Sequence, residues 1–450
     1  MEREFFKTRL GFLLVSAGCA VGIGNVWRFP FLVGQNGGGF FVLFYLLFLI
    51  LMGAPVLTME LAVGRASHRT VRSAFKMLEP KGSFWHLHGV LCFFGCLLLM
   101  MYYTTVSGWM LNYFGKFSLG TFSEISSEQV NGIFDAMLQS PAEMILGLGI
   151  IVFFGFFVNS FGIQKGLEKI SKWIMIGLFL LIVLLALNSL RLPNAMEGVK
   201  FYLLPNWDNL KEQGIGNVLT AAMNQAFFTL SIGIGSMEIF GSYMSDKFSI
   251  GGESIRICSL DTLVALMAGF IIMPACFAYG IQPDAGPSLI FLSLPQVFVH
   301  MSGGRFWGSV FFLFMTFASF STVLAVFEYL ISYCLDEFHW TRKKTTILCF
   351  FAVFLLSLPC ALGYNILSDL YPIGNRDILE SEDFILSNIL LPFGALVFIL
   401  FCVTKWGWGF DKYIAEANKG KGLKIPHWFK YYFRFVLPIL IFIVFINGLL

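Results

Sequence analysis

The stretch Ala17-Gly-Cys-Ala-Val-Gly-Ile-Gly-Asn25 places three glycines within seven residues in the middle of an apolar segment at about 10–33. A second interruption, Phe228-Thr-Leu-Ser-Ile-Gly-Ile-Gly235, lies within the apolar segment at about 216–243. For one such segment alone, close helix packing through glycine is the better interpretation. Two interruptions, five apolar segments apart, occupy matching positions in two halves of opposite orientation. The pattern therefore predicts an inverted repeat with a binding site between two broken helices.

The composition is that of a membrane protein. Of the 450 residues, 57% are hydrophobic and 13% are charged, and the mean hydropathy is +0.77. Soluble chains carry roughly a quarter charged residues, so a soluble protein is excluded. The net charge of +3 gives no reason to expect nucleic acid, and the nine cysteines form neither a CxxC pair nor a disulfide framework. Without an HExxH, GxSxG or P-loop motif, we do not expect an enzyme.

Eleven apolar segments are long enough for membrane helices of about 20 residues. With the N-terminus inside, 23 of the 30 lysines and arginines fall on the inner side, as the positive-inside rule requires, and the C-terminus lies outside. We expect an all-α polytopic membrane protein with one transporter domain, residues 1–450. It comprises helices 1–5 at about 10–190, helices 6–10 at about 216–404 as the second half of a five-plus-five inverted repeat, and helix 11 at about 430–449.

Five motifs carry a resemblance to a known family. They are Gly22-Ile-Gly-Asn-Val-Trp-Arg-Phe-Pro30, Asn36-Gly-Gly-Gly39, Gln225-Ala-Phe-Phe-Thr-Leu-Ser231, Leu260-Asp-Thr262 and Leu335-Asp-Glu337. Over nearly its whole length the chain resembles bacterial members of the neurotransmitter:sodium symporter family, and its eleven helices are similar to those of the tyrosine and hydrophobic amino-acid symporters. The resemblance implies sodium-coupled symport of an amino acid by alternating access.

Two sodium sites follow from the resemblance. The first would use the Ala20 carbonyl, Asn25, Thr229 and Asp261, together with the substrate carboxylate. The second would use the carbonyls of Gly18, Val21 and Ala318 and the hydroxyls of Ser321 and Thr322. Asp261 also stands out by itself, because a carboxylate at the bilayer centre costs about 2.5–3.5 kcal/mol and is usually functional. The two hydroxyls alone would not indicate a site, since hydroxyls in membrane helices commonly bond their own backbone.

The substrate class depends on Gly22, where monoamine carriers of the family have Asp. Glycine there implies a substrate that brings its own carboxylate, a neutral L-amino acid. The carboxylate would contact the Gly24 N–H and the Tyr103 hydroxyl, and the amine would face Ala20, Phe228, Thr229 and Ser231. The pocket wall would include Leu99, Ile234, Thr322 and Val326, which suits a hydrophobic or aromatic side chain. A betaine or an imino acid remains an alternative substrate.

Two charge pairs are candidate gates. Arg28 and Asp383 can form an outer pair above a lid of Tyr103 and Phe228, and Arg3 and Asp336 can form an inner pair. Opposed gates around one site are typical of alternating access and argue against a channel. An amino-acid sensor built on the same scaffold remains an alternative function.

Departures from the family pattern bear on the remaining expectations. Cys19 replaces a common Asn, Phe6 replaces a Trp, and Ala265 stands where chloride-dependent relatives have Ser. With Asp261 one turn away, we expect no requirement for chloride. Glu60 is expected to accept hydrogen bonds from the unwound backbone, whereas Glu238 and Glu328 receive no role, and proton antiport at them stays open.

The expected setting is a bacterial cytoplasmic (inner) membrane. The expected partners are the lipid bilayer, the amino-acid substrate and Na⁺, two ions per cycle. A homodimer stays open.

Overall fold

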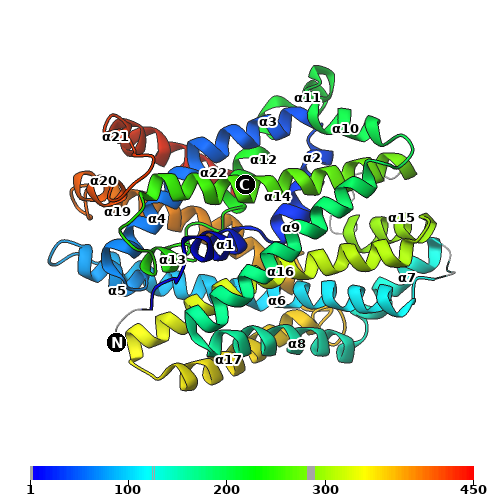
Figure 1. Cartoon of the computed structure of the whole chain (residues 1–450), viewed down its shortest axis with the longest axis horizontal. Helices are drawn as coiled ribbons and strands as arrows, with labels where there is room; N and C mark the ends of the chain where they lie inside the picture. The colour runs from blue at the N-terminus through cyan, green and yellow to red at the C-terminus, as the bar shows by residue number, and fades with distance from the viewer. Residues whose placement is uncertain (1–3, 124, 126, 281–288, 450) are drawn as a thin grey trace.

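The computed structural model describes residues 4–123, 125, 127–280 and 289–449 as a bundle of helices (Figure 1). Within these ranges, β pairing is limited to two isolated bridges. Short helices gather at the two ends of the bundle (Figure 1). The end that holds the N-terminus, here called the N-terminal end, carries α5 (Val71–Leu78) and α20 (Phe410–Ala417), and the opposite end carries α7 (Ser127–Leu138) and α15 (Leu294–His300).

Nine helical stretches in the described residues are long and apolar enough to cross a membrane, and a bent pair makes a tenth. The nine are α3 (Gly39–Phe48) with η2 (Leu49–Gly53) and α4 (Ala54–Ser67); η3 (Trp85–Leu87) with α6 (His88–Leu119); α8 (Pro141–Ser160); η4 (Ile163–Glu168) with α9 (Lys169–Ser189); α14 (Ile250–Tyr279); α16 (Gly304–Phe338); α17 (Arg342–Leu362); α18 (Ile378–Phe384) with η6 (Ile385–Leu390) and α19 (Leu391–Val403); and α21 (Phe429–Tyr431) with η7 (Tyr432–Val436) and α22 (Leu437–Leu449). The connections contain α10 (Ala195–Leu203), α11 (Trp207–Gln213) and η5 (Leu289–Ser293).

The bent pair is the first expected span. Helix α1 (Arg9–Ala20) ends where Val21 takes an extended conformation with φ −68° and ψ 101°. The chain resumes as η1 (Gly24–Arg28) and α2 (Phe29–Gln35), and the axis turns by 57° across the break. The interruption lies at the glycine-rich stretch, so the predicted break in the first span is confirmed.

The sixth expected span is interrupted more widely. Helix α12 (Ile215–Phe228) and helix α13 (Glu238–Ser242) are separated by residues 229–237, which are not helical. Three residues of this segment have positive φ: Ser231 at 51°, Gly233 at 104° and Gly235 at 74°. Glycine adopts such angles without a steric penalty, which explains why the unwound segment can form at these two positions. The predicted second break is confirmed.

Both breaks lie inside the protein. Helix α1 packs against α9, α14 and α16, and α13 packs against α4. In Figure 1, α1 lies among these helices in the middle of the bundle. Unwound backbone at membrane depth is tolerated only where protein or a cavity surrounds it. The arrangement therefore places free backbone groups at the centre of the molecule, where they can bind a ligand.

Candidate functional site

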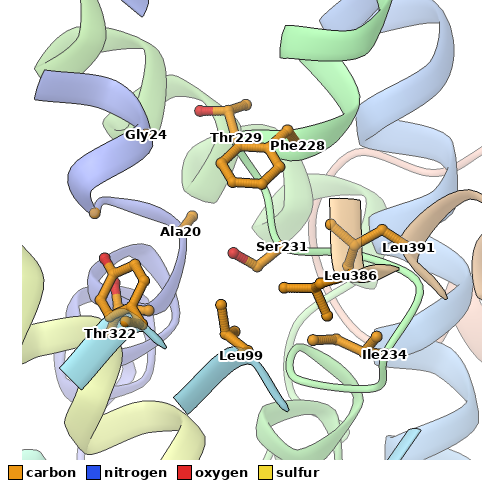
Figure 2. A pocket seen from close by; sticks show the side chains of 12 residues that line it. Ala20, Gly24, Leu99, Phe228, Thr229, Ser231, Ile234, Thr322, Leu386 and Leu391 are labelled. Carbon is orange, nitrogen blue, oxygen red and sulfur yellow. The ribbon is translucent and has the colours of Figure 1, made fainter. Parts of the chain in front are cut away.

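A cavity lies between the two broken spans (Figure 2). The space there that atoms do not fill, open solvent included, is about 400 Å³. Its wall consists of Ala20, Gly22, Gly24, Leu99, Tyr103, Phe228, Thr229, Ser231, Ile234, Thr322, Leu386 and Leu391. Every residue expected to contact the substrate lies in this wall except Val326, which is fully buried in α16 but does not line the cavity. Leu386 and Leu391 line it without having been predicted.

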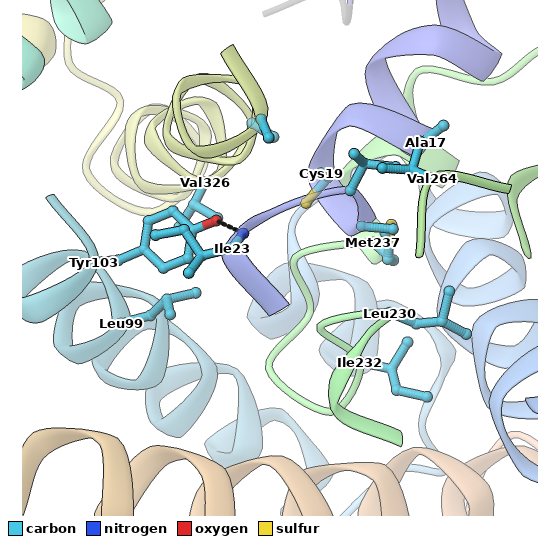
Figure 3. Close-up of a cluster of buried hydrophobic side chains, with 14 of the residues drawn as sticks. Ala17, Cys19, Ile23, Leu99, Tyr103, Leu230, Ile232, Met237, Val264 and Val326 are labelled. Atoms are coloured by element: carbon cyan, nitrogen blue, oxygen red, sulfur yellow. Dashed lines mark hydrogen bonds between the residues drawn. The ribbon is translucent and has the colours of Figure 1, made fainter. Parts of the chain in front are cut away.

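One end of the cavity is polar. The Tyr103 hydroxyl accepts a hydrogen bond from the Ile23 backbone N–H at 3.0 Å (Figure 3). A Cβ atom at Gly22 would lie 2.4 Å from the Tyr103 hydroxyl and 2.8 Å from Thr322 Oγ1. A side chain at position 22 would therefore displace both hydroxyl groups. The structure thus has glycine where the unwound backbone passes directly beside these two polar groups.

A buried carboxylate joins the first break to α14. Asp261 is 0% exposed. It accepts hydrogen bonds from Asn25 Nδ2 at 2.7 Å and from Thr229 Oγ1 at 3.0 Å. Among the ion pairs of the described residues, none involves Asp261. A buried charge without a partner of opposite charge is costly, so this group of side chains is suited to hold a cation.

Oxygen atoms from α1 and α16 form a second cluster. Ser321 Oγ lies 2.9 Å from the Gly18 carbonyl oxygen, 3.3 Å from that of Val21 and 2.8 Å from that of Ala318. Thr322 Oγ1 lies within 3.3–3.4 Å of the Gly18, Cys19 and Val21 carbonyl oxygens. A hydroxyl group has one proton to donate, so the two hydroxyls cannot donate to all four of these carbonyls. The surplus of oxygen acceptors fits a hard cation, and unwound carbonyls bind Na⁺ in this way in transporters.

Glu60 of α4 anchors the second break. Its carboxylate accepts a hydrogen bond from the Gly233 backbone N–H, and the side chain is 0% exposed. Ser236 Oγ donates to the Ser231 carbonyl at 2.5 Å. The expectation that Glu60 binds unwound backbone is therefore confirmed for the sixth span. Glu328, which had no predicted role, accepts from Tyr243 and Ser332 at 3.0 Å each and forms an ion pair with Arg342.

A larger vestibule adjoins the cavity, and the space there that atoms do not fill, open solvent included, is about 1350 Å³. Gly24, Tyr103 and Phe228 line both spaces, so they separate one from the other. Arg28 and Asp383 both line the vestibule but do not form an ion pair with each other among those of the described residues. Instead, Arg28 Cζ lies 4.2 Å from the centre of the Phe228 ring, and Asp383 accepts from Tyr102 and Ser387. Both residues of the candidate outer pair thus line the vestibule, but they are not in contact as an ion pair.

The candidate inner pair is only partly visible. Asp336 accepts from the Thr70 N–H at 2.8 Å and lies 3.6 Å from Arg69 Nη1, whereas Arg3 lies outside the described residues. Phe6 stands where the family usually has Trp. Its ring packs edge to face against the ring of Tyr243, with 5.9 Å between the ring centres.

Two acidic residues that were not predicted fasten the N-terminal segment to the bundle. Glu168 accepts from the backbone N–H groups of Lys7 and Thr8 and from the Thr8 hydroxyl at 2.8–3.1 Å. Glu253 pairs with Arg9 at 2.6 Å. These contacts join the N-terminal segment to η4 and to α14.

Comparisons with known proteins agree with this architecture. The family model described as the sodium:neurotransmitter symporter family matches residues 3–124 and 127–450. The chain is 35% identical to the uncharacterized sodium-dependent transporter YhdH of Bacillus subtilis, over 98% of this chain and 97% of that protein. It is 27% identical to the sodium-dependent serotonin transporter of Drosophila melanogaster, over 100% of this chain and 76% of that protein.

A solved structure has the same fold. The crystal structure of MhsT in complex with L-phenylalanine matches with a TM-score of 0.88 and 34% identity, over 99% of this chain and 100% of that chain. The match confirms the all-helical fold with an inverted repeat that the sequence predicted. Its relatives are transporters, as expected for a chain that is not an enzyme.

Proposed function

Since the chain belongs to the sodium:neurotransmitter symporter family, we propose that it carries a neutral L-amino acid with a hydrophobic or aromatic side chain into the cell, coupled to Na⁺ by alternating access. The observation that carries the proposal is the cavity between the two broken spans, which is polar at one end and apolar at the other. A zwitterion with an apolar side chain matches both ends.

The polar end supports binding of the substrate's carboxylate. Tyr103 can turn its hydroxyl proton toward a carboxylate, because its oxygen already accepts from Ile23. The Gly24 backbone lies beside it in the wall. Half-helix N-termini in broken membrane helices favour anionic substrate groups, and η1 begins at Gly24. The amine would then face Ala20, Phe228, Thr229 and Ser231.

Two Na⁺ ions complete the proposed complex. The first would bind between the Ala20 carbonyl, Asn25, Thr229 and Asp261, with the substrate's carboxylate as an added ligand. In the described arrangement Asn25 Oδ1 accepts from the Gly22 N–H at 3.1 Å, so ion binding would require its amide to turn. The second ion would bind between the carbonyls of Gly18, Val21 and Ala318 and the hydroxyls of Ser321 and Thr322. A carboxylate shared between substrate and ion makes each bind more tightly in the presence of the other.

The apolar end supports the substrate class. Leu99 and Ile234 lie there (Figure 2), and uncharged side chains avoid the cost of burying a charge. L-phenylalanine is the ligand of the MhsT structure, to which this chain is 34% identical. We therefore place hydrophobic and aromatic amino acids first among the candidate substrates.

The charged ends of the pathway complete the cycle. The proposed orientation places the N-terminus in the cytoplasm of a bacterial cell and the vestibule outside, with the C-terminus also outside. Arg28 and Asp383 would approach each other when the outer side closes over Phe228. At the other end, release of the N-terminal segment, including Arg3 from Asp336, would open the cavity to the cytoplasm.

Equilibrium binding to the purified chain tests this proposal. A panel of labelled amino acids is measured in NaCl and in choline chloride, with a betaine and proline in the same panel. The proposal requires saturable, Na⁺-dependent binding of hydrophobic or aromatic members. Tight binding of the betaine alone, or binding that is equal in choline, would contradict it.

A further inference from the structure

Two leucines of the tenth span form the apolar end of the cavity. Leu386 in η6 is 1% exposed and Leu391 at the start of α19 is 2% exposed, and both line the cavity. In Figure 2 they lie with Ile234 and Leu99, across the cavity from Gly24 and Thr322. A substrate whose carboxylate is held at the polar end would direct its side chain toward these leucines.

The π-helical turn of η6 explains why both leucines reach the cavity. Residues five apart are separated by about 140° around an α-helix with 3.6 residues per turn, so they would face different neighbours. In a π-helical turn, hydrogen bonds join residues five apart, and such residues stack along one face. Leu386 and Leu391 are five apart across η6 (Ile385–Leu390). Such turns frequently occur at functional sites.

Direct backbone contact fixes this wall against the unwound segment of span six. A Cβ atom at Gly233 would lie 2.1 Å from the Leu391 carbonyl oxygen, and one at Gly394 would lie 1.9 Å from the Gly233 carbonyl oxygen. Gly233 is also held by Glu60. The leucine wall and the neighbouring Ile234 therefore lie on backbone segments in direct contact, and the volume of their side chains sets the depth of the cavity at this end.

The same turn carries the candidate outer gate. Ser387, the residue after Leu386, donates to Asp383 Oδ1 at 2.7 Å, and Tyr102 donates to the same oxygen at 3.0 Å. A side chain that pressed on Leu386 would displace the turn that positions Asp383. The size of the substrate's side chain is thus connected to the outer end of the pathway through one helical turn.

We propose that Leu386 and Leu391 are specificity-determining residues that set the upper size limit for the substrate's side chain. This inference rests on the proposed function, because it takes the ligand to be a neutral amino acid. Shortening either leucine would enlarge the apolar end and favour a large aromatic side chain over a smaller aliphatic one. A hydrophobic pocket discriminates about 10- to 200-fold per methylene group, so the change in preference is measurable.

The test is the ratio of Kd for L-tryptophan to Kd for L-leucine, measured in NaCl with the purified full-length chain. The variants are Leu386→Ala and Leu391→Ala, and the matched control is Ile389→Ala, on the same π-helical segment but outside the cavity wall. We expect the ratio to fall about tenfold in either leucine variant and to stay within about twofold in the control.

The outcomes separate the two proposals. An unchanged ratio in a leucine variant that still binds both amino acids overturns this inference and leaves the proposed function standing. Failure of the unmodified chain to bind any hydrophobic or aromatic amino acid of the panel in NaCl overturns the proposed function and this inference together. If Leu386→Ala does not fold, Leu391→Ala decides the question alone.

Discussion

Asn25 Nδ2 donates a hydrogen bond of 2.7 Å to Asp261 Oδ1, which joins η1, directly after the break in the first span, to the seventh span, α14. Asp261 is fully buried, and Thr229 of the sixth span donates to its other oxygen. One carboxylate therefore connects both broken spans to a continuous helix. In the proposed cycle, a Na⁺ ion bound at Asp261 would contact residues of both broken spans at once.

Removing the charge of Asp261 should weaken Na⁺ binding. The substitution Asp261→Asn keeps the shape of the side chain but loses an attraction of about 4 kcal/mol at 4 Å in a medium of effective dielectric constant 20. Part of this lost attraction is offset, because the variant no longer bears the desolvation cost of a buried carboxylate. We expect the Na⁺ concentration for half-maximal substrate binding to rise about 10- to 100-fold. The exposed Asp411→Asn variant is the control, and an unaltered Na⁺ dependence in Asp261→Asn would refute the assignment.

The hydroxyl cluster on α16 offers a closely matched comparison. Ser321→Ala removes a hydroxyl that lies among three carbonyl oxygens of the proposed second site. Ser319→Ala, two residues away, removes an equally buried hydroxyl that bonds only the Thr316 carbonyl of its own helix. Titration of binding with Na⁺ should show about a tenfold loss of apparent affinity, about 1.4 kcal/mol, for Ser321→Ala and little change for Ser319→Ala. Equal effects of the two substitutions would argue for a purely structural hydroxyl.

Tyr103→Phe tests the proposed carboxylate contact. A hydrogen bond to a charged group is worth about 1.5–3 kcal/mol, which corresponds to about 10- to 150-fold in substrate Kd. Tyr113→Phe on the same helix removes a buried hydroxyl that bonds the Phe291 carbonyl outside the cavity wall. Substrate Kd, measured at saturating Na⁺, should rise only for Tyr103→Phe. If both variants bind as the unmodified chain does, the carboxylate lies elsewhere.

Glu168 should keep the N-terminal segment bound to the helix bundle. Its carboxylate accepts three hydrogen bonds from Lys7 and Thr8, so Glu168→Ala would release the N-terminal segment. Hydrogen exchange reports such local opening, and we expect the amides of Lys7 and Thr8 to exchange at least about tenfold faster. The control is Glu143→Ala, which removes a partly exposed partner of Lys116 at the other end of the helix bundle. Unchanged protection of the two amides would show that other contacts, such as Arg9 with Glu253, hold the segment alone.

Chloride should be dispensable. Ala265 offers no hydroxyl to an anion, and it lies one helical turn from the buried carboxylate of Asp261, which would repel chloride. Replacement of chloride by gluconate at constant Na⁺ should leave substrate binding within about twofold, since no ligand of the proposed complex is lost. A loss of binding that is restored by adding chloride would contradict this prediction.

The two breaks could be predicted from the glycine-rich segments, whereas the individual site residues followed from the resemblance to the family. Gly22 lies in the first break and Gly233 and Gly235 lie in the second, where Thr229 and Ser231 line the cavity. Leu386 could not be predicted in this way, because a π-helical turn shifts the face that an α-helical pattern would assign. The Arg9–Glu253 pair joins residues 244 positions apart, and only the packing of α1 against α14 brings them together.

Val326 is an expected wall residue that does not line the cavity. The family resemblance implied that it lines the cavity together with Thr322, but its side chain is buried in α16 and is not part of the cavity wall. Helical periodicity indicates which face a residue lies on, whereas the extent of a cavity depends on the side chains that the other helices contribute.

Accumulation in proteoliposomes tests the central claim most directly, because a sensor binds its ligand without moving it. The purified chain is given an inward tenfold Na⁺ gradient and a membrane potential of 100 mV, inside negative, and a labelled hydrophobic amino acid. Each Na⁺ then contributes about 2.3 kcal/mol from the potential and about 1.4 kcal/mol from the gradient. Two ions permit accumulation up to about 10⁵-fold and one ion up to about 500-fold. The account predicts concentrative uptake that exceeds the one-ion limit and disappears when choline replaces Na⁺, whereas saturable binding without accumulation would contradict it.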